Sequence, residues 1–173
     1  MKAALPLAAI LLLTVSACDK PKPRPAAVAA AAAAAAGAPT VMPPASAGLA
    51  KRPEMAVFTL DMINGAQDPL NIPATIQSGQ PTTFSGFGFD PVARTAGKAI
   101  DIVIDGVAYG TNYGGERQDV AAYYKTGAVT PSGFRVTLPA GIVKPGPHKM
   151  EIRVVAADGK AFHDSATLSF YAK

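Results

Sequence analysis

The chain has 173 residues and carries 16 Lys and Arg against 12 Asp and Glu, which gives a net charge of +4 at pH 7 with neutral histidines. All of the excess lies in residues 1–55, with six basic and two acidic side chains, whereas residues 56–173 carry ten of each. Because a region without net charge lacks the positive field that draws a protein to nucleic acid, the composition argues against a nucleic-acid partner for residues 56–173.

The first 17 residues have the layout of a secretory signal peptide. Lys2 is followed by an apolar run from Ala3 to Val15 and then by the small residues Ser16 and Ala17. The apolar run is too short to cross a hydrocarbon core, which needs roughly 20 residues. We therefore expect residues 1–17 to direct export of the chain.

The single cysteine of the chain, Cys18, follows this segment directly and has no partner for an intramolecular disulfide. The sequence Val15-Ser16-Ala17-Cys18 resembles the lipobox of bacterial lipoproteins. That resemblance implies cleavage before Cys18, acylation of this residue and anchorage in a bilayer of the bacterial cell envelope, facing the periplasm. It also implies that Asp19 favours the inner over the outer membrane. The alternative is an ordinary signal peptide with an incidental cysteine.

Residues 18–55 are rich in proline and alanine. Alternating prolines from Pro21 to Pro25 favour the extended polyproline II form, and the alanine run Ala29–Ala36 is too short to form a stable helix alone. Few large apolar side chains are present to offset the entropy of ordering. We therefore expect a disordered linker over 18–55, which acts as a spacer between the lipidated Cys18 and a domain over 56–173.

From residue 56 onward, short runs of alternating apolar residues recur between turn residues. They predict strands over 57–63, 80–90, 99–105, 107–113, 132–140, 146–159 and 166–172, with one short helix over 116–125. In the third run Ile100, Ile102 and Ile104 point to one face, and Asp101 points to the other. Seven short strands in a domain of this size favour an all-β, immunoglobulin-like antiparallel sandwich, with a small barrel as the alternative.

Five short motifs resemble a bacterial extracytoplasmic Ig-like domain. They are Gly88-Phe89-Asp90, Ile104-Asp105-Gly106, Arg117-Gln118-Asp119-Val120, Gly133-Phe134 and Pro145-Gly146-Pro147-His148. The resemblance implies a sandwich fold and a location outside the cytoplasm. It implies no catalytic activity.

Two groups of residues are candidates for a functional surface. The charged group consists of Arg117, Asp119, Asp90 and Asp105 and predicts a polar clasp. This clasp either pins the 106–131 connection to the sheet or holds a ligand, and we favour the structural role. The aromatic group predicts either a binding surface on a Gly-rich connection or core packing; it consists of Tyr109, Tyr113, Tyr123 and Tyr124.

The sequence contains no recognisable constellation for catalysis or metal binding. His148 and His163 lack partners at ligand spacing, and the aspartates fit no calcium loop. We therefore expect no cofactor, no metal and no enzymatic activity. The expected function is that of a membrane-anchored envelope lipoprotein that presents its Ig-like domain to another envelope protein or complex. The alternative is a module that binds peptidoglycan or another saccharide.

Overall fold

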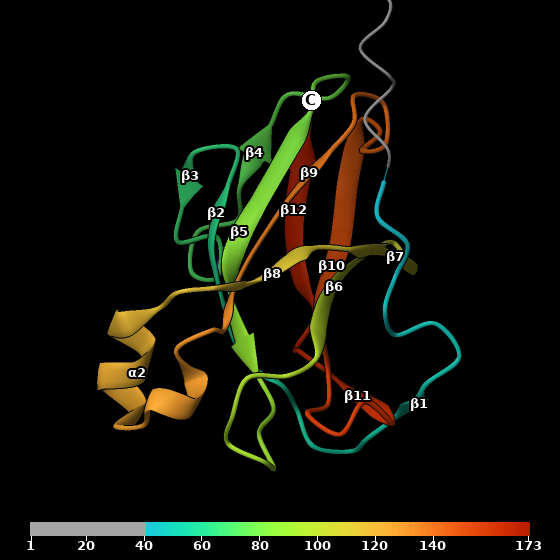
Figure 1. Ribbon diagram of the computed structural model, residues 1–173. Helices are drawn as coiled ribbons and strands as arrows, with labels where there is room; N and C mark the ends of the chain where they lie inside the picture. Colours follow the sequence, from blue (N-terminus) through green and yellow to red (C-terminus); the bar gives the residue numbers. More distant parts are fainter. Residues whose placement is uncertain (1–40) are drawn as a thin grey trace, which may run out of the picture. The chain divides into compact units, whose positions relative to one another are not determined.

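The computed structural model describes residues 41–173, which form two β-sheets packed face to face (Figure 1). Sheet A contains β1 (Ala50–Lys51), β4 (Thr75–Ile76), β6 (Ala99–Ile104), β7 (Val107–Gly110), β10 (Gly146–Val155), β11 (Ala161–Asp164) and β12 (Leu168–Ala172). Sheet B contains β2 (Val57–Ile63), β3 (Ala66–Gln67), β5 (Thr82–Phe89), β8 (Asn112–Gly115) and β9 (Gly133–Leu138). A short helix, α2 (Gln118–Tyr124), and a 3₁₀ turn, η1 (Gly127–Val129), connect β8 to β9.

The strand order identifies the sandwich as immunoglobulin-like. Sheet B runs β3-β2-β5-β9-β8, and the long strands of sheet A run β7-β6-β10-β12. The distribution of the eight main strands between the two sheets is that of an Ig domain with one added strand. In chain order these strands are β2, β5, β6, β7, β8, β9, β10 and β12. The predicted Ig-like sandwich is confirmed, and the barrel alternative is wrong because the chain forms two separate sheets.

Alternation of apolar residues along the strands fills the space between the sheets. Ile100, Ile102 and Ile104 of β6 are buried there, as the pattern predicts. The opposing residues of the core are Leu60, Ile63, Phe84, Phe134, Val136 and Leu138. Gly88 faces inward on β5, where an added Cβ would lie 2.9 Å from Ile100 Cδ1, so that position leaves no space for a side chain.

The long observed strands fall within the predicted runs, but the short strands β1, β3, β4 and β11 were not predicted, and the run over 107–113 does not form one strand. That segment is two strands, because the chain leaves sheet A after β7 and joins sheet B as β8. Thr111 lies at the crossing, where its hydroxyl donates to the Ile100 carbonyl at 2.8 Å. The predicted helix over 116–125 is α2.

The expected domain boundary at Ala56 is too late, because residues 41–56 form a strap that packs on sheet A. Residues 18–40 of the expected linker lie outside the described residues. The strap begins at Val41, which packs against the core, and the Gly110 N–H donates to the Met42 carbonyl at 3.0 Å. Further along, β1 pairs in parallel with β11. In Figure 1 this N-terminal strap runs along one side of sheet A as far as β1.

A second, smaller apolar cluster lies on the outer face of sheet B. Phe87 and Phe89 point away from the main core and are covered by Val120 of α2 and by Val129. The edge of the Tyr124 ring meets Phe89, with ring centroids 4.8 Å apart. This cluster fixes the short helix α2 on the sheet, as Figure 1 shows at the lower left.

Candidate interaction site

Arg117 is the centre of a charged network at the start of α2. Its guanidinium contacts Asp119 through two nitrogens, at 3.0 and 2.7 Å, and Asp61 of β2 at 2.7 Å. The same guanidinium lies 4.9 Å from the centre of the Phe87 ring. The hydrogen bonds from Arg117 lower the pKa of Asp119 to about 2, whereas burial raises the pKa of Asp61 despite the nearby cation.

The other two carboxylates of the predicted clasp lie elsewhere. Asp90 is buried at the end of β5, where it accepts hydrogen bonds from the backbone N–H groups of Val92, Ala93 and Ala157. Although desolvation opposes the effect, these donors lower the pKa of Asp90. Asp105 accepts a hydrogen bond from the Lys149 N–H and lies 2.6 Å from His148 Nδ1.

The clasp therefore divides into three separate contacts. Arg117 and Asp119 meet, and their third partner is Asp61 rather than Asp90 or Asp105. Asp61 lies more than 50 residues from Arg117 in sequence. The strand that contains Asp61 was predicted, but its contact with Arg117 could not be. Asp90 caps the turn that follows β5, whereas Asp105 lies in the β6–β7 turn and bonds Lys149 and His148 of β10; both positions are ordinary for aspartate.

Two of the four candidate tyrosines belong to the interior. Tyr109 packs against the main core. Tyr113 crosses between the sheets: its hydroxyl donates to the Gly88 carbonyl at 2.8 Å and accepts from the Gly97 N–H at 3.0 Å. Burial raises the pKa of Tyr113 to about 12. Tyr109 and Tyr113 therefore contribute to packing, and neither forms an exposed aromatic surface.

The other two tyrosines lie on α2 and help to form a surface feature. The Tyr123 side chain is 80% exposed, and its ring meets the edge of the Tyr124 ring at a centroid distance of 5.0 Å. A hollow of about 440 Å³ lies beside this pair, between α2 and the side chains of Thr59 and Phe87 on sheet B. We call its lining the α2 face, which consists of Thr59, Phe87, Asp119, Val120, Tyr123 and Tyr124.

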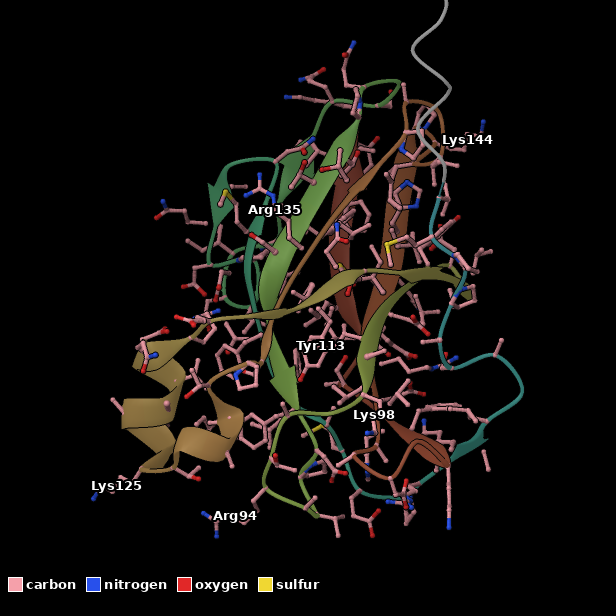
Figure 2. All side chains as sticks on the ribbon, viewed as in Figure 1. Arg94, Lys98, Tyr113, Lys125, Arg135 and Lys144 are labelled. Atoms are coloured by element: carbon pink, nitrogen blue, oxygen red, sulfur yellow. The ribbon has the colours of Figure 1, made fainter. Side chains whose placement is uncertain are left out.

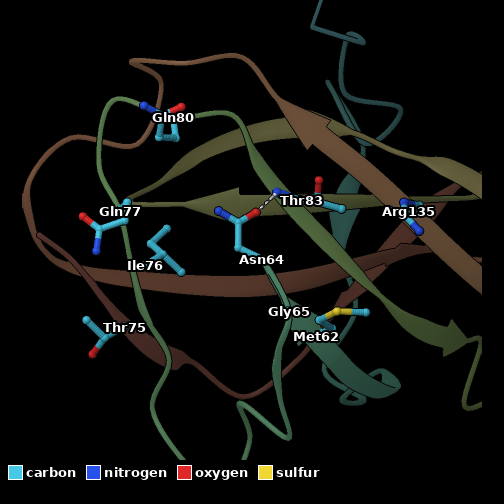
Figure 3. A pocket seen from close by; sticks show the side chains of 9 residues that line it. All are labelled: Met62, Asn64, Gly65, Thr75, Ile76, Gln77, Gln80, Thr83 and Arg135. Carbon is cyan, nitrogen blue, oxygen red and sulfur yellow. Dashed lines mark hydrogen bonds between the residues drawn. The ribbon is translucent and has the colours of Figure 1, made fainter.

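A second surface groove, lined by both polar and apolar residues, lies along sheet B away from the α2 face. At the β2–β3 hairpin it has a hollow of about 560 Å³, whose polar lining includes Asn64, Gln77, Gln80 and Thr83 (Figure 3). Nearer α2 it has a second hollow of about 430 Å³, lined in part by Ser85, Asn112 and Glu116. Arg135 of β9 lines both hollows, so it stands at the boundary between them. We call the two hollows together the outer groove.

The two histidines have structural surroundings. His163 is buried, and its Nδ1 lies 2.9 Å from the Glu54 carbonyl, which attaches the end of the strap to β11. The His148 ring stacks on Phe170 with centroids 5.0 Å apart. Within residues 41–173, no three His, Cys, Asp or Glu side chains come together as a metal site.

Comparisons with family models, with curated proteins and with solved structures find no match to this chain. The lipobox residues, including Cys18 and Asp19, lie outside the described residues. Among the helices of residues 41–173, none is long and apolar enough to cross a membrane.

Proposed function

We propose that this protein is a lipid-anchored bacterial envelope lipoprotein whose Ig-like domain binds another envelope protein through the α2 face. The lipobox resemblance at Cys18 supports the anchor. The anchor supports the bacterial envelope as the compartment. The lack of net charge in residues 56–173 argues against nucleic acid and so favours a protein of the envelope as the partner. The N-terminal strap joins the domain to the preceding linker along the surface of sheet A.

The exposure of Tyr123 on a fixed helix is the observation that carries this proposal. Tyrosine is enriched at protein interfaces because its ring contributes a large apolar area and its hydroxyl a hydrogen bond. The second apolar cluster and the Arg117 network hold α2 in place, so Tyr123 is presented to a partner at a small cost in conformational entropy. A rigid aromatic beside a pocket resembles the anchor residues that dominate binding energy at known interfaces.

A non-catalytic role agrees with the contacts of the buried carboxylates. Asp90 is bound by three backbone N–H groups, and Asp101 by two. Asp164 is paired with Lys51 and Arg153. Each of these groups therefore supports the fold rather than facing a pocket as a general acid or base.

A saccharide-binding role is the second candidate, and the outer groove supports it. Side-chain amides and hydroxyls line the hollow at the β2–β3 hairpin, and such groups pair readily with sugar hydroxyls. The exposed tyrosines of residues 41–173 are Tyr123 on α2 and Tyr171 on β12, and neither lines this hollow, so the stacking platform typical of sugar sites is separate from the amides.

Photo-crosslinking from position 123 in intact cells tests the protein-partner proposal. Position 171 is a matched control, because Tyr171 is also an exposed tyrosine, at 48%, but lies on β12 of sheet A. A discrete protein adduct from position 123 that is absent from position 171 is the expected result. Retention of the protein on purified peptidoglycan, without any protein adduct, would favour the second candidate.

A further inference from the structure

Arg135 differs from the other arginines of the outer sheet face because it has no carboxylate partner among residues 41–173. Arg117, on the same face, is occupied by Asp61 and Asp119. The exposed Arg135 points outward from β9, between the inward Phe134 and Val136. A guanidinium offers five donors in a planar fork, so Arg135 retains its full capacity to bind an anion.

The neighbours of Arg135 form a row of polar groups across the sheet. Ser85 of β5 is its cross-strand partner on one side, and Asn112 of β8 is its partner on the other. Paired residues of antiparallel strands point to the same face, so both side chains flank the guanidinium. One pair further along, the hydroxyls of Thr83 and Thr137 lie 2.8 Å apart.

The position of Arg135 in the molecule also distinguishes it from Arg94, Lys125 and Lys144, three other cations that have no acidic partner among residues 41–173. Figure 2 shows Arg135 over the strands of sheet B, whereas Arg94, Lys125 and Lys144 lie at the ends of the molecule. Only Arg135 of these four lines the hollows of the outer groove. A ligand at the β2–β3 end of the outer groove would therefore meet Arg135 as its cation without an acidic partner, with the amides of Gln77 and Gln80 beside it, whereas the carboxylate of Glu116 lines the end nearer α2.

We propose that the outer groove binds a carboxylate-bearing saccharide, with Arg135 as the residue that receives the carboxylate. The positive charge of Arg135 favours a ligand with a carboxylate, because a guanidinium and a carboxylate form a strong bidentate, charge-assisted pair. The side-chain amides of Gln77 and Gln80 line the same hollow as Arg135 and form no hydrogen bond within residues 41–173, so they can pair with the hydroxyl and acetamido groups of a saccharide. This inference deepens the second candidate function and rests on the proposed envelope location, where such acidic saccharides occur in the cell wall.

Titration of the full chain in mild detergent with muramyl dipeptide tests the proposal. This probe carries an acetamido sugar and a free carboxylate, and the uncharged trimer of N-acetylglucosamine is its neutral counterpart. Arg135→Gln should weaken binding of muramyl dipeptide by about tenfold or more, as expected for a charge-assisted hydrogen bond, and should leave the weaker binding of the trimer unchanged. Arg135→Lys should give an intermediate affinity, because it retains the charge without the fork.

Arg94→Gln is the matched control, since it removes an equal charge from an exposed loop outside the groove. The proposal is overturned if both glutamine variants bind the probe equally, or if the wild-type chain does not bind muramyl dipeptide at millimolar concentration. Equal binding of a capped acidic peptide, acetyl-Ala-Glu-Ala-amide, would assign the groove to protein ligands and overturn the saccharide. Crosslinking from position 123 does not involve Arg135, so failure of this inference and failure of the α2 proposal are separate results.

Discussion

The carboxylate of Asp101 lies fully buried in sheet A and accepts hydrogen bonds from the backbone N–H groups of Ala45 and Ser46, at 3.0 and 2.8 Å. This contact joins β6 to a segment more than 50 residues earlier in the chain. It explains how a stretch of Pro- and Ala-rich sequence becomes part of the domain. In the proposed function, the N-terminal strap is the point at which the membrane tether is attached to the sandwich.

Replacement of Asp101 by Asn should loosen the N-terminal strap. Two backbone donors would lose their charged acceptor, which costs about 1–3 kcal/mol in the free energy of unfolding. Urea unfolding should show this loss, and limited proteolysis should cleave within residues 41–50 more rapidly. Glu151→Gln is the control, because Glu151 lies on the neighbouring strand β10 of the same sheet and bonds only the Thr167 hydroxyl. Equal stability of the two variants would contradict the role of Asp101.

The stability of the domain should fall between pH 10 and pH 12 because of Tyr113. Its pKa is raised from 10.0 to about 12 in the folded state, so the unfolded chain releases the phenolic proton first as the pH rises. The stabilisation is complete below pH 10 and is lost as the pH passes through the folded pKa. By linkage this loss is about 3 kcal/mol. Urea unfolding at pH 9 and at higher pH measures it.

Tyr113→Phe is the variant that isolates this effect. It keeps the ring in the core but leaves the Gly97 N–H and the Gly88 carbonyl without their partner, which costs about 1–3 kcal/mol at neutral pH. The variant should also lose less stability than the wild type above pH 10. An identical alkaline decline in both proteins would assign the titration to another group.

Removal of the Arg117 charge should release Asp119. In the Arg117→Gln variant the pKa of Asp119 should rise from about 2 toward the ordinary 3.8, because the guanidinium hydrogen bonds are lost. A depressed folded pKa stabilises the protein above the unfolded value, and this contribution disappears as the pH falls toward 2. Carboxyl-detected NMR titration measures the shift directly. An unchanged pKa of Asp119 would contradict the network.

Val120→Ala should detach α2 without unfolding the sandwich. Val120 is the buried residue of this helix, and loss of its two methyl groups costs about 2 kcal/mol. Amide hydrogen exchange should accelerate over residues 118–124 and stay slow in β6 and β10. Ala122→Gly in the same helix is a control for helix propensity alone, because Ala122 is exposed. Uniform acceleration throughout both sheets would show that α2 is required for the fold.

Local sequence patterns predict the long strands and the sandwich, but not the short strands β1, β3, β4 and β11. The run over 57–63 coincides with β2, and the alternating isoleucines of 99–105 form the inward face of β6. These features depend on the two-residue period of a strand, which the sequence contains directly.

What covers the outer faces of the sheets depends on long-range contacts, and these could not be predicted. The outward position of Asp101 does not indicate its contact with Ala45 and Ser46, so the composition of the N-terminal strap predicts a linker. Tyr109 and Tyr123 lie in one connection and looked alike in sequence. The passage of the chain from sheet A to sheet B directs one into the core and leaves the other on α2.

Site-specific photo-crosslinking in intact cells tests the central claim most directly. A photo-reactive residue at position 123 should give one discrete adduct with an envelope protein, and Val120→Ala should weaken that adduct because it loosens α2. The same probe at position 171 should give none. The claim is contradicted if positions 123 and 171 give the same adducts, or if position 123 gives no protein adduct in cells in which the protein is present in the membrane fraction.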